Sequence, residues 1–146
     1  MNEIQKLLED LVSAAKAEDW EEIDSVKIPR LAAMDDSQFA IYDWIVGSGL
    51  VDGNKNVRDV AASLFAEYGL KSNHVSEVRI KKGHDELLKM LEDKHPYARY
   101  RAAFAISKHD LCKKHADHIV ILLPVLREAA KDKDVSDIAK AYLKKY

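Results

Sequence analysis

The stretch VRDVAASLFAEY, residues 57–68, decides the fold class of this 146-residue chain. Its apolar residues follow the spacing i, i+3, i+4, i+7, i+8 and i+11, beginning at Val57 and ending at Tyr68. That period places them on one face of an α-helix, whereas a half-buried strand alternates polar and apolar residues. The stretch therefore predicts an amphipathic helix that buries one face.

The same helical period runs through nearly the whole chain, and a similar stripe begins at Ile4 and ends at Ala15. Only the β-branched run at residues 119–123 has the character of a strand, and it lies inside a longer helical pattern. Five glycines and three prolines are too few for an all-β protein with many tight turns. We predict an all-α protein with helices near residues 2–18, 20–33, 37–50, 54–69, 74–92, 95–109, 115–131 and 134–146.

The composition is that of a soluble globular domain. Apolar residues make up 47% of the chain and charged residues 33%, with a formal net charge of −2. This balance disfavours nucleic acid and anionic membranes as partners, since both call for a basic face. The single cysteine, Cys112, excludes an internal disulfide framework, and the longest apolar run, residues 119–126, is too short to span a bilayer. These features predict a cytoplasmic protein.

Three segments repeat one pattern, in which an aspartate is followed by a helix that opens with small residues. The matching positions are Asp52 with Val57-Arg58 and Ala61-Ala62, Asp93 with Ala98-Arg99 and Ala102-Ala103, and Asp132 with Val135 and Ala139. The aspartates lie 41 and 39 residues apart, close to the period of about 40–47 residues in HEAT and armadillo units. Small residues let adjacent helices approach closely, and a hairpin cannot bury its apolar face alone. We therefore expect stacked helical hairpins.

The third segment also contains Leu123-Pro124-Val125-Leu126, and with it the pattern resembles the HEAT-repeat family over about residues 37–146. The resemblance implies an α-α superhelix of three helical hairpins, at residues 37–69, 74–109 and 115–146, within a single domain that covers residues 1–146. Residues 1–36 carry the pattern only faintly, so we expect them to form an N-terminal helical cap.

The resemblance implies a structural role for the turn aspartates and the helix arginines, which in this family form a hydrogen-bonded ladder between neighbouring repeats. Asp52 with Arg58, and Asp93 with Arg99, stand at the matching positions. In the third unit the turn is two residues shorter and Ser136 stands where the arginine is expected. The ladder is therefore expected to stop there.

Aligning the second helices of the three units singles out the middle one. It carries large side chains where the flanking units have polar or small ones: Tyr100 aligns with Asp59 and Asp137, Phe104 with Ser63 and Ala141, and Lys108 with Glu67 and Lys145. Polar and small residues indicate an outward face, which in HEAT-type stacks lines the concave surface. We therefore predict a groove for an unidentified protein partner, with Tyr97, Tyr100, Arg101, Phe104 and Lys108 as its residues. In the alternative interpretation the aromatic side chains pack under the first helix of the next unit.

The predicted function is a non-catalytic protein-binding or scaffold module without a cofactor. The sequence contains no Walker A loop, no Gly-x-Ser-x-Gly elbow, no His-Glu-x-x-His and no Cys-x-x-Cys. Two HEAT-like classes are kept as alternatives, the lyases that act on phycobilins and the DNA glycosylases. No residue here supports the lyase, and the absence of a basic stripe disfavours the glycosylase.

Possible metal ligands gather at residues 109–118, namely His109, Cys112, His115 and His118. Their spacing matches no common zinc motif, and a connection between two hairpins is expected there. We predict a solvated connection with a half-buried cysteine and no metal site.

Two adjacent His-Asp pairs, His84-Asp85 and His109-Asp110, resemble those of the HD-type metal-dependent phosphohydrolases. Such a site needs a further histidine before the pair, for which His74 or His95 is available, and an aspartate well after it, for which Asp134 is available. This enzyme is a second alternative. The repeat, however, already accounts for the neighbours of His84 as the apolar half of a first helix.

Overall fold

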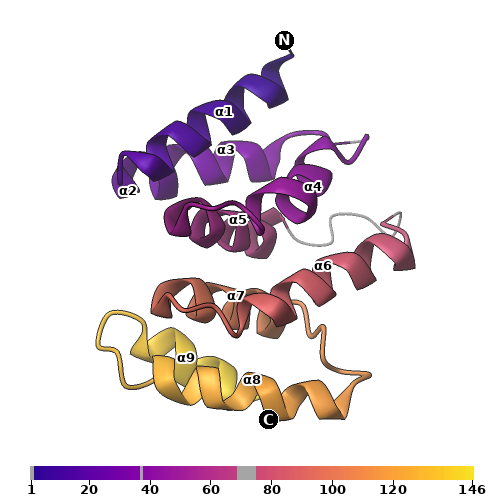
Figure 1. Cartoon of the computed structure of the whole chain (residues 1–146), viewed down its shortest axis with the longest axis vertical. Coiled ribbons are helices and arrows are strands. Elements are labelled where there is room, and N and C mark those ends of the chain that lie inside the picture. Colours follow the sequence, from indigo (N-terminus) through magenta and orange to yellow (C-terminus); the bar gives the residue numbers. More distant parts are fainter. Residues whose placement is uncertain (1, 37, 69–74) are drawn as a thin grey trace.

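The computed structural model describes residues 2–36, 38–68 and 75–146, in which helices are the only regular elements. Eight helical stretches pack together, so the prediction of an all-α protein is confirmed. They follow one another down the long axis of the molecule, from the N-terminus at one end to the C-terminus at the other (Figure 1). The elements are α1 (Glu3–Lys16), α2 (Trp20–Glu22), η1 (Ile23–Lys27), α3 (Ile28–Ala33), α4 (Ala40–Trp44), η2 (Ile45–Gly49), α5 (Lys55–Tyr68), α6 (Glu77–Met90), α7 (Pro96–Lys108), α8 (Ala116–Ala129) and α9 (Ser136–Leu143). Elements α2, η1 and α3 follow without a gap and form one of the eight helical stretches, and α4 with η2 forms another.

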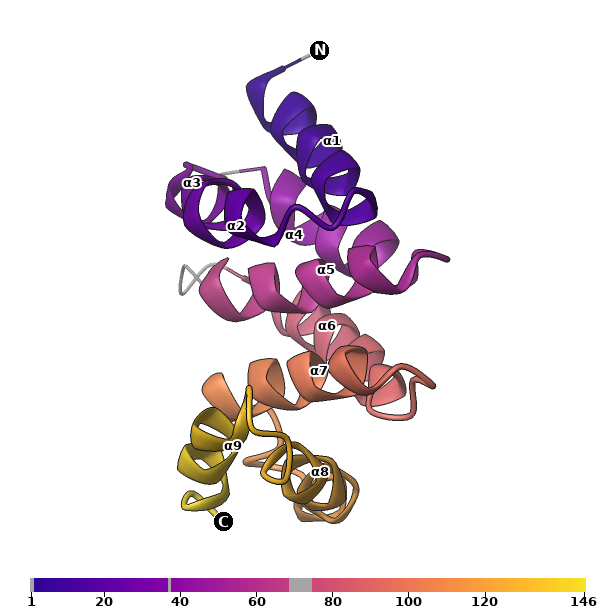
Figure 2. The ribbon, with the colours of Figure 1, turned by 90° about the vertical axis from the view of Figure 1, so that its left-hand side faces the viewer.

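The predicted hairpins correspond to α4-η2 with α5, α6 with α7, and α8 with α9, although their expected bounds at residues 37, 69 and 74 lie outside the described residues. Helix α7 begins at Pro96, as expected for a residue whose missing N–H costs nothing in a first turn. The second helices lie next to one another, since α5 packs on α3 and α7, and α7 packs on α9 (Figure 2).

Helices α5 and α7 pack on each other, and both carry fully buried alanines. These are the small residues of the repeat pattern, Ala61 and Ala62 in α5 and Ala102 and Ala103 in α7. Arg101 of α7 reaches Asp59 of α5 in an ion pair.

Two helices contain a wider π-helical turn, which the sequence did not predict. The stretch Gly47-Ser48-Gly49 is part of η2, which ends at Gly49. A Cβ atom at Gly49 would lie 2.7 Å from the Cβ of Ala61, so glycine lets η2 lie directly on α5. The other π turn, η1, ends just before Ile28-Pro29, and its wider turn accommodates a proline that cannot donate a hydrogen bond.

A buried carboxylate ties α4 to its neighbours. Asp36 accepts hydrogen bonds from the backbone N–H groups of Ile41 and Tyr42, and from the hydroxyl of Tyr68 at 2.8 Å. The hydroxyl of Tyr42 in turn donates to the carbonyl of Arg79 in α6 at 2.8 Å. Asp36 therefore caps α4 and fixes it against α5, while Tyr42 connects it to α6.

Within the ranges that the structure describes, no helix has both the length and the apolar character needed to cross a membrane.

Candidate functional site

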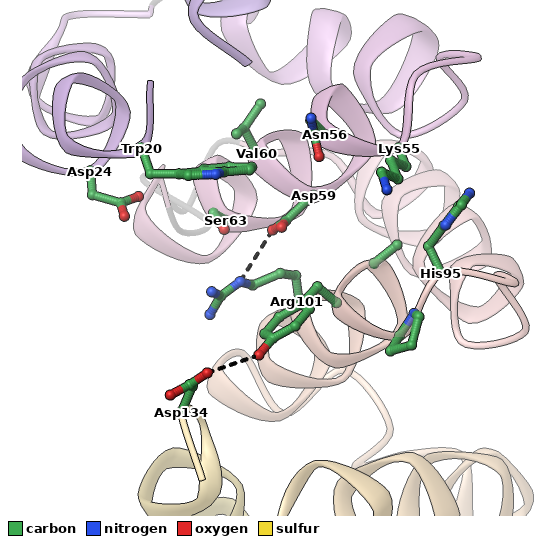
Figure 3. A pocket seen from close by; sticks show the side chains of 13 residues that line it. Trp20, Asp24, Lys55, Asn56, Asp59, Val60, Ser63, His95, Arg101 and Asp134 are labelled. Atoms are coloured by element: carbon green, nitrogen blue, oxygen red, sulfur yellow. Dashed lines mark hydrogen bonds and ion pairs between the residues drawn. The ribbon is translucent and has the colours of Figure 1, made fainter. Parts of the chain in front are cut away.

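A cleft of about 500 Å³ opens between α2-η1 on one side and α5 with α7 on the other (Figure 3). A second opening on the same side shares Asp24, Ser63 and Arg101 with it and continues toward α9. We call the two together the α5–α7 groove. The aromatic and charged side chains that line the first opening include Trp20, Asp24, Lys55, Asp59, Tyr97, Arg101 and Asp134.

Two aromatic side chains of the groove are partly open to solvent, Trp20 at 38% and Tyr97 at 37% exposure. Trp20 opens α2, and the side chain of Asp19 caps that helix by accepting a hydrogen bond from the backbone of Glu22. The Tyr97 hydroxyl donates to Asp132 at 3.0 Å, and this hydrogen bond is the main reason that the pKa of Tyr97 rises to about 12. Both rings thus occupy defined positions while they keep exposed surface for contact.

An ion pair crosses the groove from α7 to α5, with Arg101 Nε 3.1 Å from Asp59 Oδ1. Burial raises the pKa of Asp59 to about 6, although Arg101 acts in the opposite direction. The charge of Asp24 adds to the rise, so the two carboxylates are close enough to repel each other. With Asp134 and Glu67, the groove holds four carboxylates against the three cations Arg101, Lys55 and Lys108. The groove therefore carries an excess of negative charge.

Of the residues predicted for the groove, Tyr97, Arg101, Phe104 and Lys108 line it, and Lys108 pairs with Glu67 at 3.4 Å. Tyr100 lines neither opening, and the exposures of Tyr100 and Phe104 are only 5% and 6%, so the prediction that both are exposed is wrong.

These two side chains fill the space between the second and third hairpins. The ring of Phe104 packs against Tyr142 of α9 at 5.8 Å between centroids. Tyr100 packs edge-on against Tyr97, and burial together with the charge of Glu128 in α8 raises its pKa. The alternative interpretation, in which the aromatics pack under the first helix of the next unit, is right about their burial, but the ring that Phe104 contacts belongs to the second helix, α9.

The alignment missed Trp20, Asp24 and Asp134, because two of them lie in the weakly patterned N-terminal segment and the third lies in a connection. The available signal was a tryptophan within the acidic run Glu18-Asp19-Trp20-Glu21-Glu22, where an apolar ring has no helical stripe to join.

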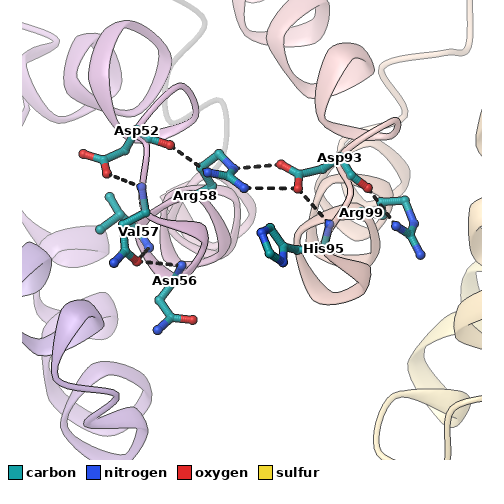
Figure 4. Close-up of polar contacts among 8 residues, drawn as sticks. Asp52, Asn56, Val57, Arg58, Asp93, His95 and Arg99 are labelled. Carbon is teal, nitrogen blue, oxygen red and sulfur yellow. Dashed lines mark hydrogen bonds and ion pairs between the residues drawn. The ribbon is translucent and has the colours of Figure 1, made fainter.

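The turn aspartates and helix arginines connect the units as Figure 4 shows. Arg58 makes a two-pronged ion pair with Asp93 of the next unit, Nε to Oδ2 at 2.7 Å and Nη2 to Oδ1 at 3.1 Å. It also donates to the carbonyl of Asp52 at 2.9 Å. Burial opposes ionisation of Asp93, but the hydrogen bonds from Arg58 and from the backbone N–H of His95 outweigh it and lower its pKa.

Arg99 continues the series in a different way. Its Nη1 donates to the carbonyl of Asp93 at 2.7 Å, and its Nη2 reaches Glu128 of α8 at 2.6 Å. The partner in the third unit is thus a helix glutamate and not the turn aspartate, Asp132, which accepts from Tyr97.

The predicted ligand cluster at residues 109–118 divides in the structure. His109 is separate from the others, because its Nε2 lies 3.2 Å and 3.1 Å from the carbonyl oxygens of Phe65 and Ala66. Cys112 is fully buried, so the expectation of a half-buried cysteine in a solvated connection is wrong. Its Sγ lies 3.6 Å from Nε2 of His84. Burial raises the pKa of the Cys112 thiol to about 11 and lowers that of His84 to about 4.

The two His-Asp pairs do not form a common site among the described residues. Asp85 binds Lys81 at 2.8 Å on the surface of α6, while Asp110 binds Lys145 at 3.0 Å. His74, which was considered as a further ligand, lies outside the described residues.

Comparison with protein-family models, with curated proteins and with solved structures gives no match for this chain. The resemblance to HEAT repeats rests on the residues of the three units themselves. What the groove can bind follows from its geometry and charge.

Proposed function

We propose that the chain is a non-catalytic, HEAT-like binding module, a short α-α superhelix whose α5–α7 groove holds a segment of a partner protein. The succession of α3, α5, α7 and α9 along one side supports the superhelix, as does the ion pair between Arg58 and Asp93. The cytoplasm is the proposed compartment, since the only cysteine of the sequence is buried and unpaired.

One observation carries the proposed function, namely that half-exposed aromatic rings and excess carboxylates line the same groove. Trp20 presents part of its ring to the groove, and a cation over a tryptophan face is attracted by the ring electrons. Asp24 and Asp134, both exposed, have no basic partner among the described ion pairs. A basic side chain in the groove gains both interactions at once. The proposed occupant is therefore a protein segment with an arginine that stacks on Trp20.

The same charges disfavour a polyanion. Nucleic acid in this groove brings phosphates against Asp24, Asp59 and Asp134, and only Lys55 lacks a carboxylate partner among the described basic residues of the groove. Contacts between basic side chains and phosphates supply most of the affinity for nucleic acid, and this lining lacks the unpaired basic side chains that such contacts need. The lining of the groove therefore fits a basic protein segment better than it fits the DNA that the glycosylase alternative requires.

The experiment uses Trp20 as its own reporter. The variant Trp44→Phe leaves Trp20 as the single tryptophan of the chain. Its fluorescence is followed during titration with three capped pentapeptides that differ only in a central arginine, glutamine or glutamate. We expect the arginine peptide to change the emission saturably and the glutamate peptide to leave it unchanged, because the excess carboxylates attract only the former.

Two variants test the role of charge. Asp24→Asn combined with Asp134→Asn should weaken binding of the arginine peptide about three- to tenfold, as expected for the loss of two exposed ion pairs. Asp35→Asn, which removes an exposed carboxylate outside the groove, is the matched control and should have no effect. Equal responses to all three peptides, or an affinity that the double variant does not change, would contradict the proposal.

A further inference from the structure

A cluster of nitrogen and sulfur ligands lies apart from the groove, on α6 and around the start of α8. One ligand atom from each of His84, Cys112 and His118 lies within 4.8 Å of the other two. His84 belongs to α6, Cys112 to the connection after α7, and His118 to the first turn of α8. His84 stands 28 residues before Cys112, so the spacing of residues 109–118 alone does not reveal the set.

The geometry within the cluster fits tetrahedral coordination. Zinc–sulfur and zinc–nitrogen bonds of about 2.3 and 2.0–2.1 Å, at tetrahedral angles, place the two ligand atoms about 3.6 Å apart. The observed separation between Cys112 Sγ and His84 Nε2 is 3.6 Å. Both side chains are buried, so their ligand atoms face each other and not solvent.

The third ligand, His118, has a nitrogen to offer. Its Nδ1 is shielded from solvent and has no hydrogen-bond partner in the part of the chain that the structure describes. Its other nitrogen, Nε2, lies 3.7 Å from a carboxylate oxygen of Asp117. A histidine that binds metal through one nitrogen commonly directs the other toward a carboxylate, which holds the ring in position.

We propose that His84, Cys112 and His118 form a zinc site. Two imidazoles and a thiolate suit zinc, whereas magnesium, calcium and manganese prefer oxygen ligands. As the bond between sulfur and zinc forms, the thiol proton passes to the solvent. Tetrahedral zinc takes a fourth ligand besides these three. The ring of His115 lies 4.7 Å from that of His118 and 5.9 Å from that of His84, so this fourth position lies on the exposed side of the cluster, beside His115.

Zinc in this site connects α6 of the second hairpin to the beginning of the third. Binding to the folded state alone raises the melting temperature, because the unfolded chain does not hold the three ligands together. The role is therefore structural, and it is independent of the proposed function of the groove.

The experiment titrates the full-length, chelator-treated protein with Co²⁺ and then displaces it with Zn²⁺. We expect one equivalent to bind, with visible absorption typical of tetrahedral cobalt and a near-ultraviolet thiolate-to-cobalt band. Cys112→Ser should abolish the thiolate band. Cys112→Ser and His118→Gln should each lower the affinity for Zn²⁺ by at least about tenfold, since mutation of even the outer-shell partners of metal ligands has an effect of that size.

His95→Gln, which removes a histidine outside the cluster, is the control and should bind Zn²⁺ like the parent. Circular dichroism of each variant separates loss of the site from loss of the fold, and His118, only partly buried, is the position that tolerates substitution best. Failure to bind Zn²⁺ stoichiometrically, absence of the thiolate band in the parent, or unchanged affinity in folded His118→Gln would overturn the assignment. So would binding lost in His115→Gln but retained in Cys112→Ser, since that places the ion at the exposed histidines.

Discussion

The two contacts between successive second helices are built from opposite chemistry. Between α5 and α7 an ion pair joins Arg101 to Asp59. Between α7 and α9 the ring of Phe104 packs on Tyr142. The groove runs beside both contacts, with the ion pair lining it at the first and the two aromatic rings at the second.

This difference teaches that equivalent positions in a repeat need not share a degree of burial. Asp59 aligns with Tyr100, yet each is mostly buried, the aspartate by pairing with an arginine and the tyrosine by packing as an aromatic ring. A polar residue at an aligned position therefore does not prove an outward face. Substitutions at the two contacts should separate their contributions.

The largest effect is expected at the aromatic contact. Phe104→Ala should lower the free energy of unfolding by about 3–5 kcal/mol, as for other buried aromatic truncations that leave a cavity. Urea denaturation measures it. Ser63→Ala, at the aligned position of α5, is the control and should stay within about 1 kcal/mol. If Phe104→Ala also costs less than about 1 kcal/mol, its side chain is not part of the core, and the contrast between the two contacts disappears.

The arginines should rank by the burial of their ion pairs. The side chains of Arg58 and Asp93 are 14% and 10% exposed, whereas those of Arg99 and Glu128 are 19% and 45% exposed. Arg58→Ala leaves a buried carboxylate without its partner and should cost about 3 kcal/mol, while Arg99→Ala should cost about 1–2 kcal/mol. Ser136→Ala, in the unit without the arginine, should change stability by less than about 0.5 kcal/mol. Denaturant midpoints that rank Arg99 above Arg58 would contradict this reading of the contacts.

The carboxylate at the polar contact should appear in the pH dependence of stability. The folded-state pKa of Asp59, about 6, lies above its ordinary value of 3.8, so its protonation stabilises the folded state. That stabilisation is complete below pH 3.8 and is lost as the pH rises through about 6, an effect on the order of 3 kcal/mol.

The measurement compares unfolding free energies of the parent and of Asp59→Asn across this range. Their difference should change with pH, because only the parent titrates at this position. The same comparison is made for Asp35→Asn, at an exposed position outside the groove, as the control. A constant difference for Asp59→Asn would show that Arg101 keeps Asp59 ionised in spite of its burial.

The helical period predicted the all-α fold and every helical stretch, because it is a local property of the chain. The π turns at Gly49 and Pro29 were not predictable, since they depend on how closely one helix lies on another. For the same reason the burial of Phe104 was missed, because the ring that covers it belongs to Tyr142, far along the chain.

The two sites were predictable only in part. Arg101 was found because it lies on the repeated helix, whereas Trp20 enters the groove from a segment with almost no repeat pattern. Cys112 and His118 stood out by their spacing, but their partner His84 comes from a different helix. A motif search along the sequence finds ligands on one segment and misses those that the fold adds.

The central claim is that the α5–α7 groove binds a basic segment, and NMR tests it most directly. Amide and indole shifts of the ¹⁵N-labelled protein are followed while the arginine-centred peptide is added. We predict that the largest changes occur at the Trp20 indole N–H and at Asp24, Asp59 and Arg101, with little change in α6. An absence of shifts at Trp20 and Asp59, or changes concentrated on α6 and α8, would contradict the assignment of the groove as the binding site.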